Sequence, residues 1–230
     1  MARSLADSPC SSLVPRRSPL VLYLASTNPG KLREFGEAAR ACGVRLEPAP
    51  GVANLPPCLE DGETFEANAR KKALHYAASA PGLVFADDSG LCVDALGGAP
   101  GVHSARYAGM GANAADSDAA NNSKLLAELR GVPHARRTAH YVCVIALAEG
   151  DRILTVVEGR ATGVILEAPR GSGGFGYDPY FFYPPLGRTF AELSAAEKLK
   201  VSHRGEAFRK LLRWLERTRQ APRARHESAR

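Results

Sequence analysis

The chain has 230 residues, of which 45% are hydrophobic and 23% are charged, so it is long enough to bury the core of one globular domain of ordinary composition. Its formal net charge is +6, and this excess lies in the two terminal segments: residues 1–19 carry three Arg against one Asp, and residues 217–230 carry five Arg against one Glu. The chain between them is neutral, which argues against a basic nucleic-acid-binding surface on the folded part.

Membrane and secreted classes also fit the sequence poorly. No apolar run approaches the roughly 20 residues that span a bilayer, and the run 20–25 is too short for the core of a secretory signal. The five cysteines form no C-x-x-C pair and share no short spacing with the six histidines, which disfavours a zinc site and indicates a reducing, cytoplasmic compartment. We expect one folded domain over residues 20–216, between a disordered N-terminal extension over 1–19 and a basic disordered tail over 217–230.

Strand and helix patterns alternate along that domain. Short apolar runs bounded by turn-forming residues predict strands, and apolar residues at helical spacing predict helices. In chain order we first expect a strand over 20–26, a turn, a helix over 32–42 and a second strand over 44–50. A helix over 64–79 with Thr64 as its N-cap, a strand over 82–88, and a helix that Ser117 caps and that extends to 130 should follow. The last expected elements are a hairpin of strands over 138–149 and 152–166 and an amphipathic C-terminal helix around 208–215. This order predicts an α/β fold with a mixed sheet.

A polar turn with a glycine and a lysine joins the first strand to the first helix. It consists of Ser26, Thr27, Asn28, Pro29, Gly30 and Lys31. Backbone N–H groups, the positive end of a helix dipole and an ammonium group together suit a phosphate chain. The turn lacks the P-loop pattern G-x-x-x-x-G-K-[ST], so a plain helix entry with a solvated lysine is the alternative.

Two adjacent carboxylates, Asp87 and Asp88, follow the apolar run that predicts the third strand. Consecutive side chains of a strand point to opposite sides, so only one of them needs to face a cleft, while the other can pair locally. A carboxylate beside bound phosphates is repelled unless a divalent cation lies between them, and Mg²⁺ takes one or two protein carboxylates and otherwise water and phosphate oxygens. The alternative is an acidic turn without a ligand.

The glycine-rich segment 171–176 matches the pattern G-x-G-x-x-G, but a proline-rich stretch follows it instead of a helix, so it does not predict a dinucleotide-binding turn. It is either a mobile loop or an aromatic platform, with Phe175 or Tyr177 stacked on a base. Near the start of the last helix, His203 and Arg204 could grip an anion or a base edge, or face solvent.

Taken together, five segments resemble the inosine triphosphate pyrophosphatase family in that family's order and spacing. The resemblance extends from about Val21 to Leu215 and rests on ASTNPGK, TFEANARKKA, ADDSGLCVDALGGAPGVHSARYAG, GGFGYDPYFF, and AELSAAEK followed by SHRG. It implies an elongated mixed β-sheet with flanking helices and two lobes around a central nucleotide cleft, usually in a homodimer. It also implies Mg²⁺-dependent hydrolysis of ITP, dITP and XTP to the nucleoside monophosphate and pyrophosphate, which removes deaminated purines from the nucleotide pool.

The resemblance assigns roles to residues by position. Asp88 is implied to be the catalytic acid or base and a metal ligand, with Glu60 as a second metal-linked carboxylate. Asp61 is adjacent to Glu60, so the second metal-linked carboxylate could be either of these two residues, and Glu66 is a weaker candidate. Asp87 could share the metal-binding and proton-transfer roles of Asp88. The expected substrate-binding residues are Ser26, Thr27, Asn28, Pro29, Gly30, Lys31, Ser89, Phe175, Gly176, Tyr177, Asp178, Lys198, His203 and Arg204.

The implied reaction is attack of a water molecule on the α-phosphorus with departure of pyrophosphate. Asp88 would orient or deprotonate the water, and Lys31 and Mg²⁺ would neutralise the leaving group. Donors at Lys198 and Arg204 would favour the 6-keto group of inosine and xanthosine over the 6-amino group of adenosine, while the exclusion of GTP stays open. The alternatives are a Maf-like pyrophosphatase for other nucleotides, a non-catalytic nucleotide sensor, and nucleic-acid binding by the Arg-rich tails.

Overall fold

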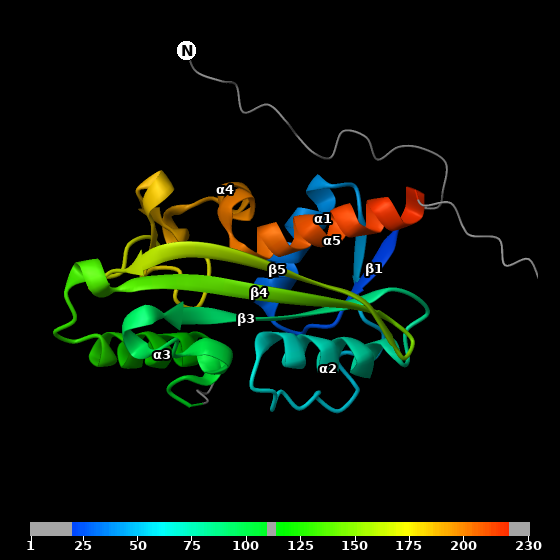
Figure 1. Ribbon diagram of the computed structural model, residues 1–230, viewed down its shortest axis with the longest axis horizontal. Helices are drawn as coiled ribbons and strands as arrows, with labels where there is room; N and C mark the ends of the chain where they lie inside the picture. Colours follow the sequence, from blue (N-terminus) through cyan, green and yellow to red (C-terminus); the bar gives the residue numbers. More distant parts are fainter. Residues whose placement is uncertain (1–19, 110–113, 221–230) are drawn as a thin grey trace, which may run out of the picture.

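The computed structural model describes residues 20–109 and 114–220. The expected extension over 1–19 lies outside the described residues, as does the expected tail from residue 221 onward. The framework is a seven-stranded sheet in the order β2-β1-β3-β4-β5-β6-β7, with helices on both faces (Figure 1). β1 pairs in parallel with β2 and β3, and the other neighbouring strands are antiparallel. The mixed α/β fold expected from the sequence is confirmed.

The helices and strands have the following bounds. The strands are β1 (Val21–Leu24), β2 (Arg45–Pro48), β3 (Val84–Val93), β4 (Thr138–Glu149), β5 (Arg152–Ile165), β6 (Phe181–Tyr183) and β7 (Arg188–Thr189). The α-helices are α1 (Pro29–Ala41), α2 (Phe65–Ala77), α3 (Ala114–Glu128), α4 (Ala195–Val201) and α5 (His203–Gln220). The β4–β5 hairpin is confirmed, and the glycine-rich segment 171–176 is a loop that opens no helix.

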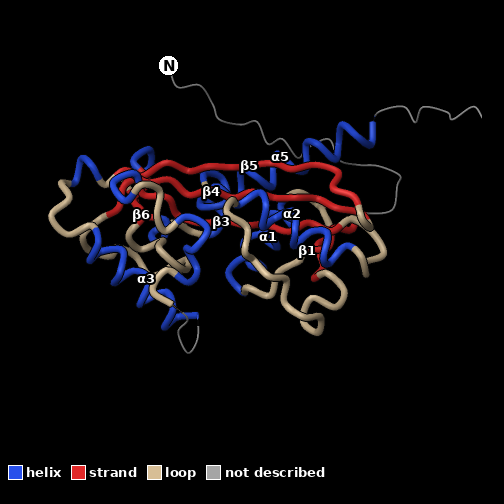
Figure 2. The backbone as a smooth tube through the Cα atoms, turned by 60° about the horizontal axis from the view of Figure 1, so that its bottom comes forward, coloured by secondary structure: helices blue, strands red, loops and turns tan. Residues whose placement is uncertain are grey.

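The sheet separates two helical layers. α1, α4 and α5 lie over one face, and α2 and α3 lie over the other (Figure 1). Figure 2 shows the long strands β3, β4 and β5 side by side. On the first face, the rings of Phe35, Phe85 and Phe208 lie with centroids 5.2 to 5.7 Å apart. On the second face, the small residue Ala69 of α2 belongs to the same buried cluster as Ala86 of β3. Alternate residues of β3 therefore serve opposite layers, as the two-residue period of a strand requires.

A third buried cluster fills the other end of the sheet. It contains Leu125 and Leu129 of α3, together with Phe181 and Phe190, and β3 reaches it at Leu91. The segment of β3 between these clusters carries Asp87 and Asp88, so the acid pair lies at the boundary between the buried clusters at the two ends of the sheet.

Strand β3 is longer than the sequence predicted. We expected it to end at the acid pair, but it continues to Val93 and pairs with β4 along its whole length. Asp87 lies opposite Ile145 and Asp88 opposite Val144. The acids are therefore mid-strand residues whose backbone groups belong to the sheet, and their side chains point to its two faces.

Helix boundaries show one confirmed cap and several corrections. Thr64 caps α2 as expected, since its Oγ1 accepts from the Ala67 N–H at 3.1 Å. Ser117 does not cap α3, because that helix begins at Ala114. α1 begins at Pro29, so the end of the predicted turn is the first turn of the helix.

The last helix runs into the segment that we expected to be a tail. α5 ends at Gln220 rather than before residue 217 and carries Arg217 and Arg219 in its last turn. Arg and Gln are good helix formers, and cations near a helix C-terminus interact favourably with its dipole. The helix therefore continues beyond Leu215, the last of its buried apolar residues.

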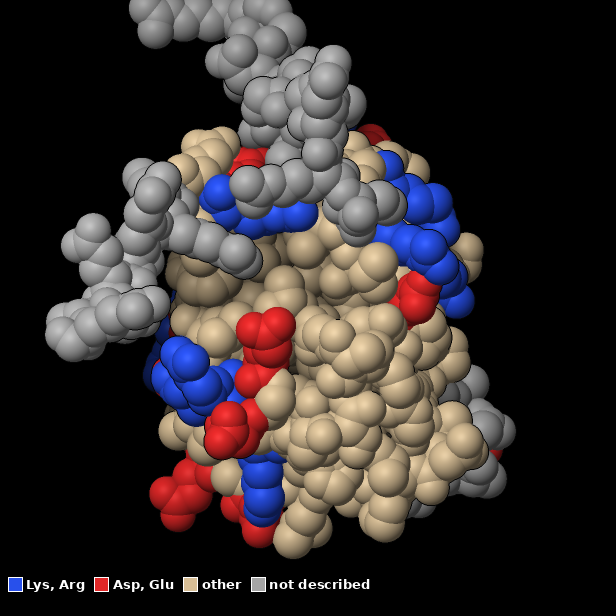
Figure 3. Space-filling view, turned by 90° about the vertical axis from the view of Figure 1, so that its right-hand side faces the viewer, with Lys and Arg blue, Asp and Glu red and all other residues tan. Residues whose placement is uncertain are grey.

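Charge is divided into small groups on the end of the molecule that Figure 3 shows. There Lys and Arg lie in separate groups, with Asp and Glu near several of them and broad areas of uncharged residues between them (Figure 3). This view agrees with the neutral balance of residues 20–216. None of the described helices is long and apolar enough to cross a membrane.

Candidate functional site

The N-terminus of α1 is an exposed polar turn. Asn28 caps the helix, because its Oδ1 accepts from the Lys31 N–H at 3.1 Å, while its own N–H donates to Ser26 Oγ at 3.2 Å. Pro29 occupies the first helical position, where a missing N–H group does no harm. Thr27, Asn28 and Pro29 are exposed. The positive end of the α1 dipole is therefore open to an anion.

Asp87 is a buried carboxylate held by cations from the α1 and α5 layer. It is 1% exposed, and its Oδ2 lies 2.9 Å from Lys31 Nζ and 3.7 Å from Arg204 Nε. Ser89 Oγ also donates to Asp87 Oδ2, at 3.0 Å. Burial acts to raise the pKa of Asp87, but Lys31 and Arg204 outweigh burial and lower this pKa to about 2. Asp87 is therefore ionised, and it anchors Lys31 beside the exposed turn.

Asp88 faces the α2 layer and has a different environment. It is 5% exposed, its Oδ1 lies 3.2 Å from Lys72 Nζ, and its Oδ2 accepts from Asn68 Nδ2 at 3.1 Å. Burial raises the pKa of Asp88, and the opposing effect of Lys72 is smaller. Two adjacent carboxyl groups thus have pKa values shifted in opposite directions. The two carboxyl groups therefore differ in environment, because they face different layers and different cations.

Lys72 lies between two carboxylates that are distant in the sequence. Its Nζ is 3.2 Å from Asp88 Oδ1 and 3.3 Å from Glu60 Oε2. The loop that carries Glu60 is fixed on both sides, because Arg106 Nη2 donates to Glu60 O at 3.0 Å and Asn68 Oδ1 accepts from the Gly62 N–H at 2.8 Å. The carboxylates of Glu60 and Asp88 therefore both point toward the Lys72 ammonium, which we call the shared cationic point.

The two other candidate carboxylates of this segment point elsewhere. Asp61 Oδ1 lies 2.5 Å from the half-exposed ammonium of Lys71. Glu66 pairs with Arg70 at 2.7 Å along the exposed side of α2. Neither shares the cationic point at Lys72, so the geometry favours Glu60 over Asp61 and Glu66 as the companion of Asp88.

Across β3, a second charged cluster joins α1 to the junction of α4 and α5. Glu34 accepts ion pairs from Lys198 at 2.5 Å and from Arg204 at 2.9 Å. Lys198 also reaches Asp178 at 2.5 Å, and Arg204 Nη2 donates to Ser89 Oγ at 2.8 Å. The chain breaks its helix at Ser202, between α4 and α5, which is how Lys198 and Arg204 come to face the same carboxylate.

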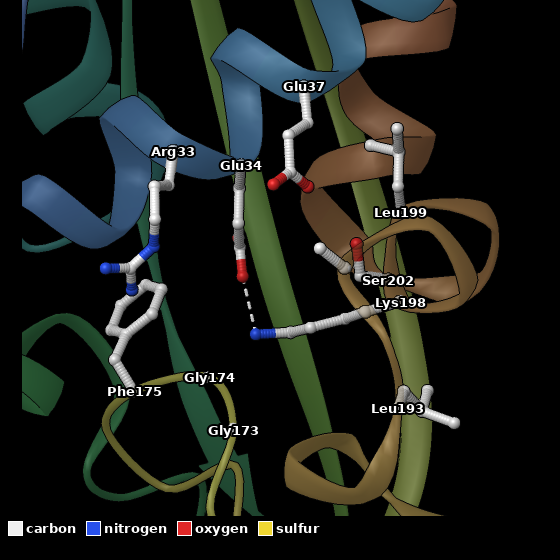
Figure 4. A pocket seen from close by; sticks show the side chains of 11 residues that line it. Arg33, Glu34, Glu37, Gly173, Gly174, Phe175, Leu193, Lys198, Leu199 and Ser202 are labelled. Carbon is white, nitrogen blue, oxygen red and sulfur yellow. Dashed lines mark hydrogen bonds and ion pairs between the residues drawn. The ribbon is translucent and has the colours of Figure 1, made fainter.

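An aromatic cavity adjoins this cluster. The ring of Phe175 lies 5.1 Å from Lys198 Nζ and 4.9 Å from the guanidinium carbon of Arg204. The same ring packs against Gly30, where an added Cβ would lie 2.6 Å from a ring carbon. The cavity measures about 260 Å³ and is lined by Arg33, Glu34, Glu37, Gly173, Gly174, Phe175, Leu193, Ala195, Lys198, Leu199 and Ser202 (Figure 4). This volume lies just below the roughly 300–1,000 Å³ of whole-ligand pockets, so it suits one part of a nucleotide.

Of the four consecutive residues expected to cover a base, only Phe175 lines the cavity. Tyr177 is buried, and its hydroxyl donates to Ser104 O at 2.8 Å. Asp178 is buried and accepts from the Phe175 N–H at 2.9 Å. Gly176 contributes its backbone to bonds with α3. In this structure these three residues hold the loop, and Phe175 is the one that it presents.

His203 is part of the core rather than of the cavity wall. Its ring stacks on Tyr141 with centroids 4.5 Å apart and planes 8° from parallel. Burial, aided by Arg204 and Lys198, holds the pKa of His203 well below 6.5, so the ring is neutral. Both ring nitrogens lack a hydrogen-bond partner among the described residues.

Sequence reasoning missed three residues of this region. Asn68, Lys72 and Glu34 are internal partners of the predicted site residues. A signal existed for the first two, since they immediately precede the apolar positions Ala69 and Ala73 of a helix and therefore border its buried side. Glu34 has no comparable signal, because a Glu in the first turns of a helix is common on solvated surfaces.

Comparison with known proteins gives one consistent family. The sequence model of the Ham1 family matches residues 22–214. A dITP/XTP pyrophosphatase of Syntrophobacter fumaroxidans is 50% identical over 202 residues, covering 85% of this chain and 84% of that protein. A dITP/XTP pyrophosphatase of Gloeobacter violaceus is 51% identical over 191 residues, covering 83% of this chain and 92% of that protein.

Solved structures agree with the sequence comparison. A HAM1 protein from Coxiella burnetii superposes with a TM-score of 0.75 at 41% identity, covering 86% of this chain and 99% of that chain. The Ham1 protein of Staphylococcus aureus gives a TM-score of 0.74 at 38% identity with the same coverage.

Proposed function

The chain belongs to the Ham1 family, and on that premise we propose that it hydrolyses the non-standard purine nucleoside triphosphates ITP, dITP and XTP to the nucleoside monophosphate and pyrophosphate. The observation that carries this proposal is the arrangement around α1. Its first turn, with Lys31, contacts Asp87 of the acid pair, and Glu34 one turn later lines the aromatic cavity. A single nucleotide can therefore place phosphates at the turn and a base in the cavity.

The triphosphate would be held by the α1 N-terminus and two lysines. An ammonium group has three donors, and Lys31 gives Asp87 contacts at its carboxylate and, at 3.4 Å, its backbone oxygen. One N–H group of the Lys31 ammonium is therefore left to donate to a phosphate oxygen. Lys72 lies on the other side of the acid pair and would meet the same phosphate chain. Opposite charge on both sides of the phosphates stabilises charge that develops in phosphoryl transfer.

Two carboxylates of the α2 side would hold a divalent cation in place of the Lys72 ammonium. Asp88 Oδ1 and Glu60 Oε2 are both aimed at the position of Lys72 Nζ, at 3.2 and 3.3 Å. No third acidic, His or Cys side chain completes a metal cluster in the described part of the chain. Mg²⁺ needs only one or two carboxylates beside water and phosphate oxygens, so we propose Mg²⁺ held by Asp88 and Glu60. When bound, it supplies positive charge to the phosphates.

Asp88 is the proposed proton acceptor. Asp87 Oδ2 is held by Lys31 and Ser89, and the pKa of Asp87 is lowered to about 2, so Asp88 is the better base of the pair. A water molecule attacks the α-phosphorus and gives its proton to Asp88 as the bond to the bridging oxygen breaks. The pyrophosphate that leaves carries the new charge, and Lys31 lies where it can donate to that group.

Selectivity for the purine would come from donors oriented before the base arrives. Glu34 holds both Lys198, which lines the cavity, and Arg204, whose guanidinium lies 4.9 Å from the Phe175 ring, so the N–H groups of both side chains have fixed directions. The 6-keto group of inosine or xanthosine accepts from such donors, whereas the 6-amino group of adenosine leaves them unpaired. A mismatch of buried polar groups rejects a substrate by as much as ~10⁴-fold.

A nucleotide panel tests the proposal. Pyrophosphate release is measured for ITP, XTP, GTP, ATP, dTTP and UTP, with Mg²⁺ and with a chelator. We expect release from ITP and XTP that depends on Mg²⁺ and exceeds release from ATP by orders of magnitude. Equal rates for ITP and ATP would contradict the selectivity argument. A preference for dTTP or UTP would favour a Maf-like enzyme, and tight ITP binding without release would favour a nucleotide sensor.

The assembly and the location of the protein stay predictions. The resemblance implies a homodimer, which sedimentation equilibrium of the full chain would measure. The scattered cysteines predict a reducing, cytoplasmic compartment, which cell fractionation would test. If the Arg-rich tails bind nucleic acid, deletion of residues 217–230 should abolish that binding while sparing hydrolysis.

A further inference from the structure

The glycine-rich loop is attached to α3 through one residue. The Gly176 N–H donates to Asp118 Oδ2 at 2.6 Å, and Gly176 O accepts from Asn122 Nδ2 at 3.0 Å. Asp118 and Asn122 are one helical turn apart in α3, so their side chains leave the same face of the helix. Both polar backbone groups of one loop residue are thus held by one turn of one helix.

The backbone conformation of Gly176 makes this double contact. Its φ of 64° lies in the left-handed region that glycine adopts freely. A Cβ at this position would meet nothing within 4 Å, so conformation rather than space favours glycine. In that conformation the N–H and the C=O of Gly176 both reach α3.

The contacts of Asp118 and Asn122 with Gly176, here called the clamp, adjoin the aromatic residue of the cavity. Phe175 directly precedes Gly176, and its own N–H donates to Asp178 Oδ2 at 2.9 Å. The Phe175 carbonyl accepts from the Asp178 N–H at 3.4 Å, so all four polar backbone groups of Phe175 and Gly176 are bonded, while the ring packs on Gly30 and near Arg204. α3 lies on the opposite face of the sheet from α1 (Figure 1), so the clamp ties the cavity to the other helical layer.

The two clamp residues are polar, yet burial withdraws both side chains at least partly from water. Asn122 is 9% exposed, and its Oδ1 lacks a partner among the described residues. Burial also raises the pKa of the Asp118 carboxyl, and the Gly176 N–H only partly offsets it. An apolar pair at these positions would leave the Gly176 N–H and C=O without these partners, and a buried polar group without a partner is destabilising.

We propose that Asp118 and Asn122 are positioning residues for the nucleobase, which hold Gly176 so that Phe175 covers the cavity. The inference rests on the proposed function, in which the cavity takes a purine. A base stacks on an aromatic ring whatever group it carries at its 6-position. Loss of the clamp therefore weakens the binding of all purine nucleotides alike and leaves proton transfer at Asp88 unchanged.

Steady-state kinetics separate binding from chemistry. In Asp118→Ala and in Asn122→Ala we expect KM for ITP to rise about fivefold or more, with kcat within about twofold of wild type. KM for XTP should rise by the same factor. Asp118→Asn keeps an oxygen that accepts from Gly176 and should restore wild-type KM. Ser123→Ala is the matched control on α3, because the Ser123 hydroxyl donates only within the helix, to Ala119 O at 2.9 Å.

Amide hydrogen exchange tests the clamp without any assumption about the substrate. In the ligand-free protein, peptides covering 171–179 should exchange faster in both alanine variants and at wild-type rates in Asp118→Asn and Ser123→Ala. If the wild-type protein releases no pyrophosphate from any purine nucleotide, the proposed function fails, and exchange still reports on the clamp.

Three results would overturn the proposal. They are wild-type exchange in both alanine variants, faster exchange with unchanged KM, and a fall in kcat as large as the rise in KM. Thermal unfolding shows whether each variant folds. Should Asp118→Ala not fold, Asn122→Ala decides, because it removes only the contact to the Gly176 carbonyl.

Discussion

Replacing Lys72 with Met should destabilise the metal-free protein through Asp88. Lys72 is 6% exposed and Asp88 is 5% exposed, and the two charges lie 3.2 Å apart. Removing one partner of a buried ion pair leaves an uncompensated charge, which lowers the free energy of unfolding by about 3–5 kcal/mol. Asp88 can take up a proton and still accepts from Asn68, so we expect the lower end of this range. For a domain of this size, the Tm falls by about 6–12 °C.

Mg²⁺ should restore more stability to this variant than it adds to the wild type. In the wild type the Lys72 ammonium lies between Asp88 and Glu60, so a metal ion competes with a cation that is already present. In Lys72→Met that competitor is gone. The measurement is thermal unfolding in a chelator and in excess Mg²⁺.

Lys71→Met is the matched control for Lys72→Met. The side chain of Lys71 is 46% exposed, and its pair with Asp61 lies on the surface, so its loss should lower stability by about 1 kcal/mol or less. Equal Tm losses in the two variants would refute the role of Lys72 as the counter-ion of Asp88. An equal effect of Mg²⁺ on Lys72→Met and wild type would refute the shared cationic point.

Three further predictions concern the same region. Asp88→Asn should lower kcat for ITP at least ~100-fold, measured as pyrophosphate release, and near wild-type turnover would remove Asp88 from the mechanism. Gly30→Ala should raise KM for ITP and lower the Tm, because the new Cβ would lie 2.6 Å from the Phe175 ring and the ring must shift; an unchanged KM would contradict this. The pKa of Asp87 falls from 3.8 to about 2 on folding, so its contribution of about 2 kcal/mol is complete above about pH 4 and is lost as the pH falls toward 2. Asp87→Asn should flatten this acid limb in denaturant unfolding between about pH 2 and pH 5, and an unchanged limb would contradict the assignment.

Local patterns predicted the elements whose determinants are neighbours in the sequence. Thr64 caps α2 because its hydroxyl needs only the N–H three residues later. The β4–β5 hairpin follows from two apolar runs joined by a short turn. The polar turn at Lys31 and the acid pair were recognisable for the same reason, since each is a short segment whose residue types already restrict its chemistry.

The structure of β3 could not be predicted in this way. A strand that ends at Asp88 was the reasonable expectation, because buried carboxylates in mid-strand are unfavourable without partners. The partners are Lys31 and Lys72, which come from helices on opposite faces of the sheet. A sequence pattern does not show which distant cation will neutralise a given acid.

The sequence by itself determined the α/β class, most element types and the segments that carry the chemistry, since these depend on spacing within a few residues of one another. Only the tertiary structure decided how these segments divide the work. It paired Asp87 and Asp88 with different lysines, placed Glu34 between two cations, and turned Tyr177 inward while Phe175 faces the cavity. The physical reason is that burial and the distance to a partner set the charge of a carboxyl group, and both arise only when elements from separate parts of the chain pack together.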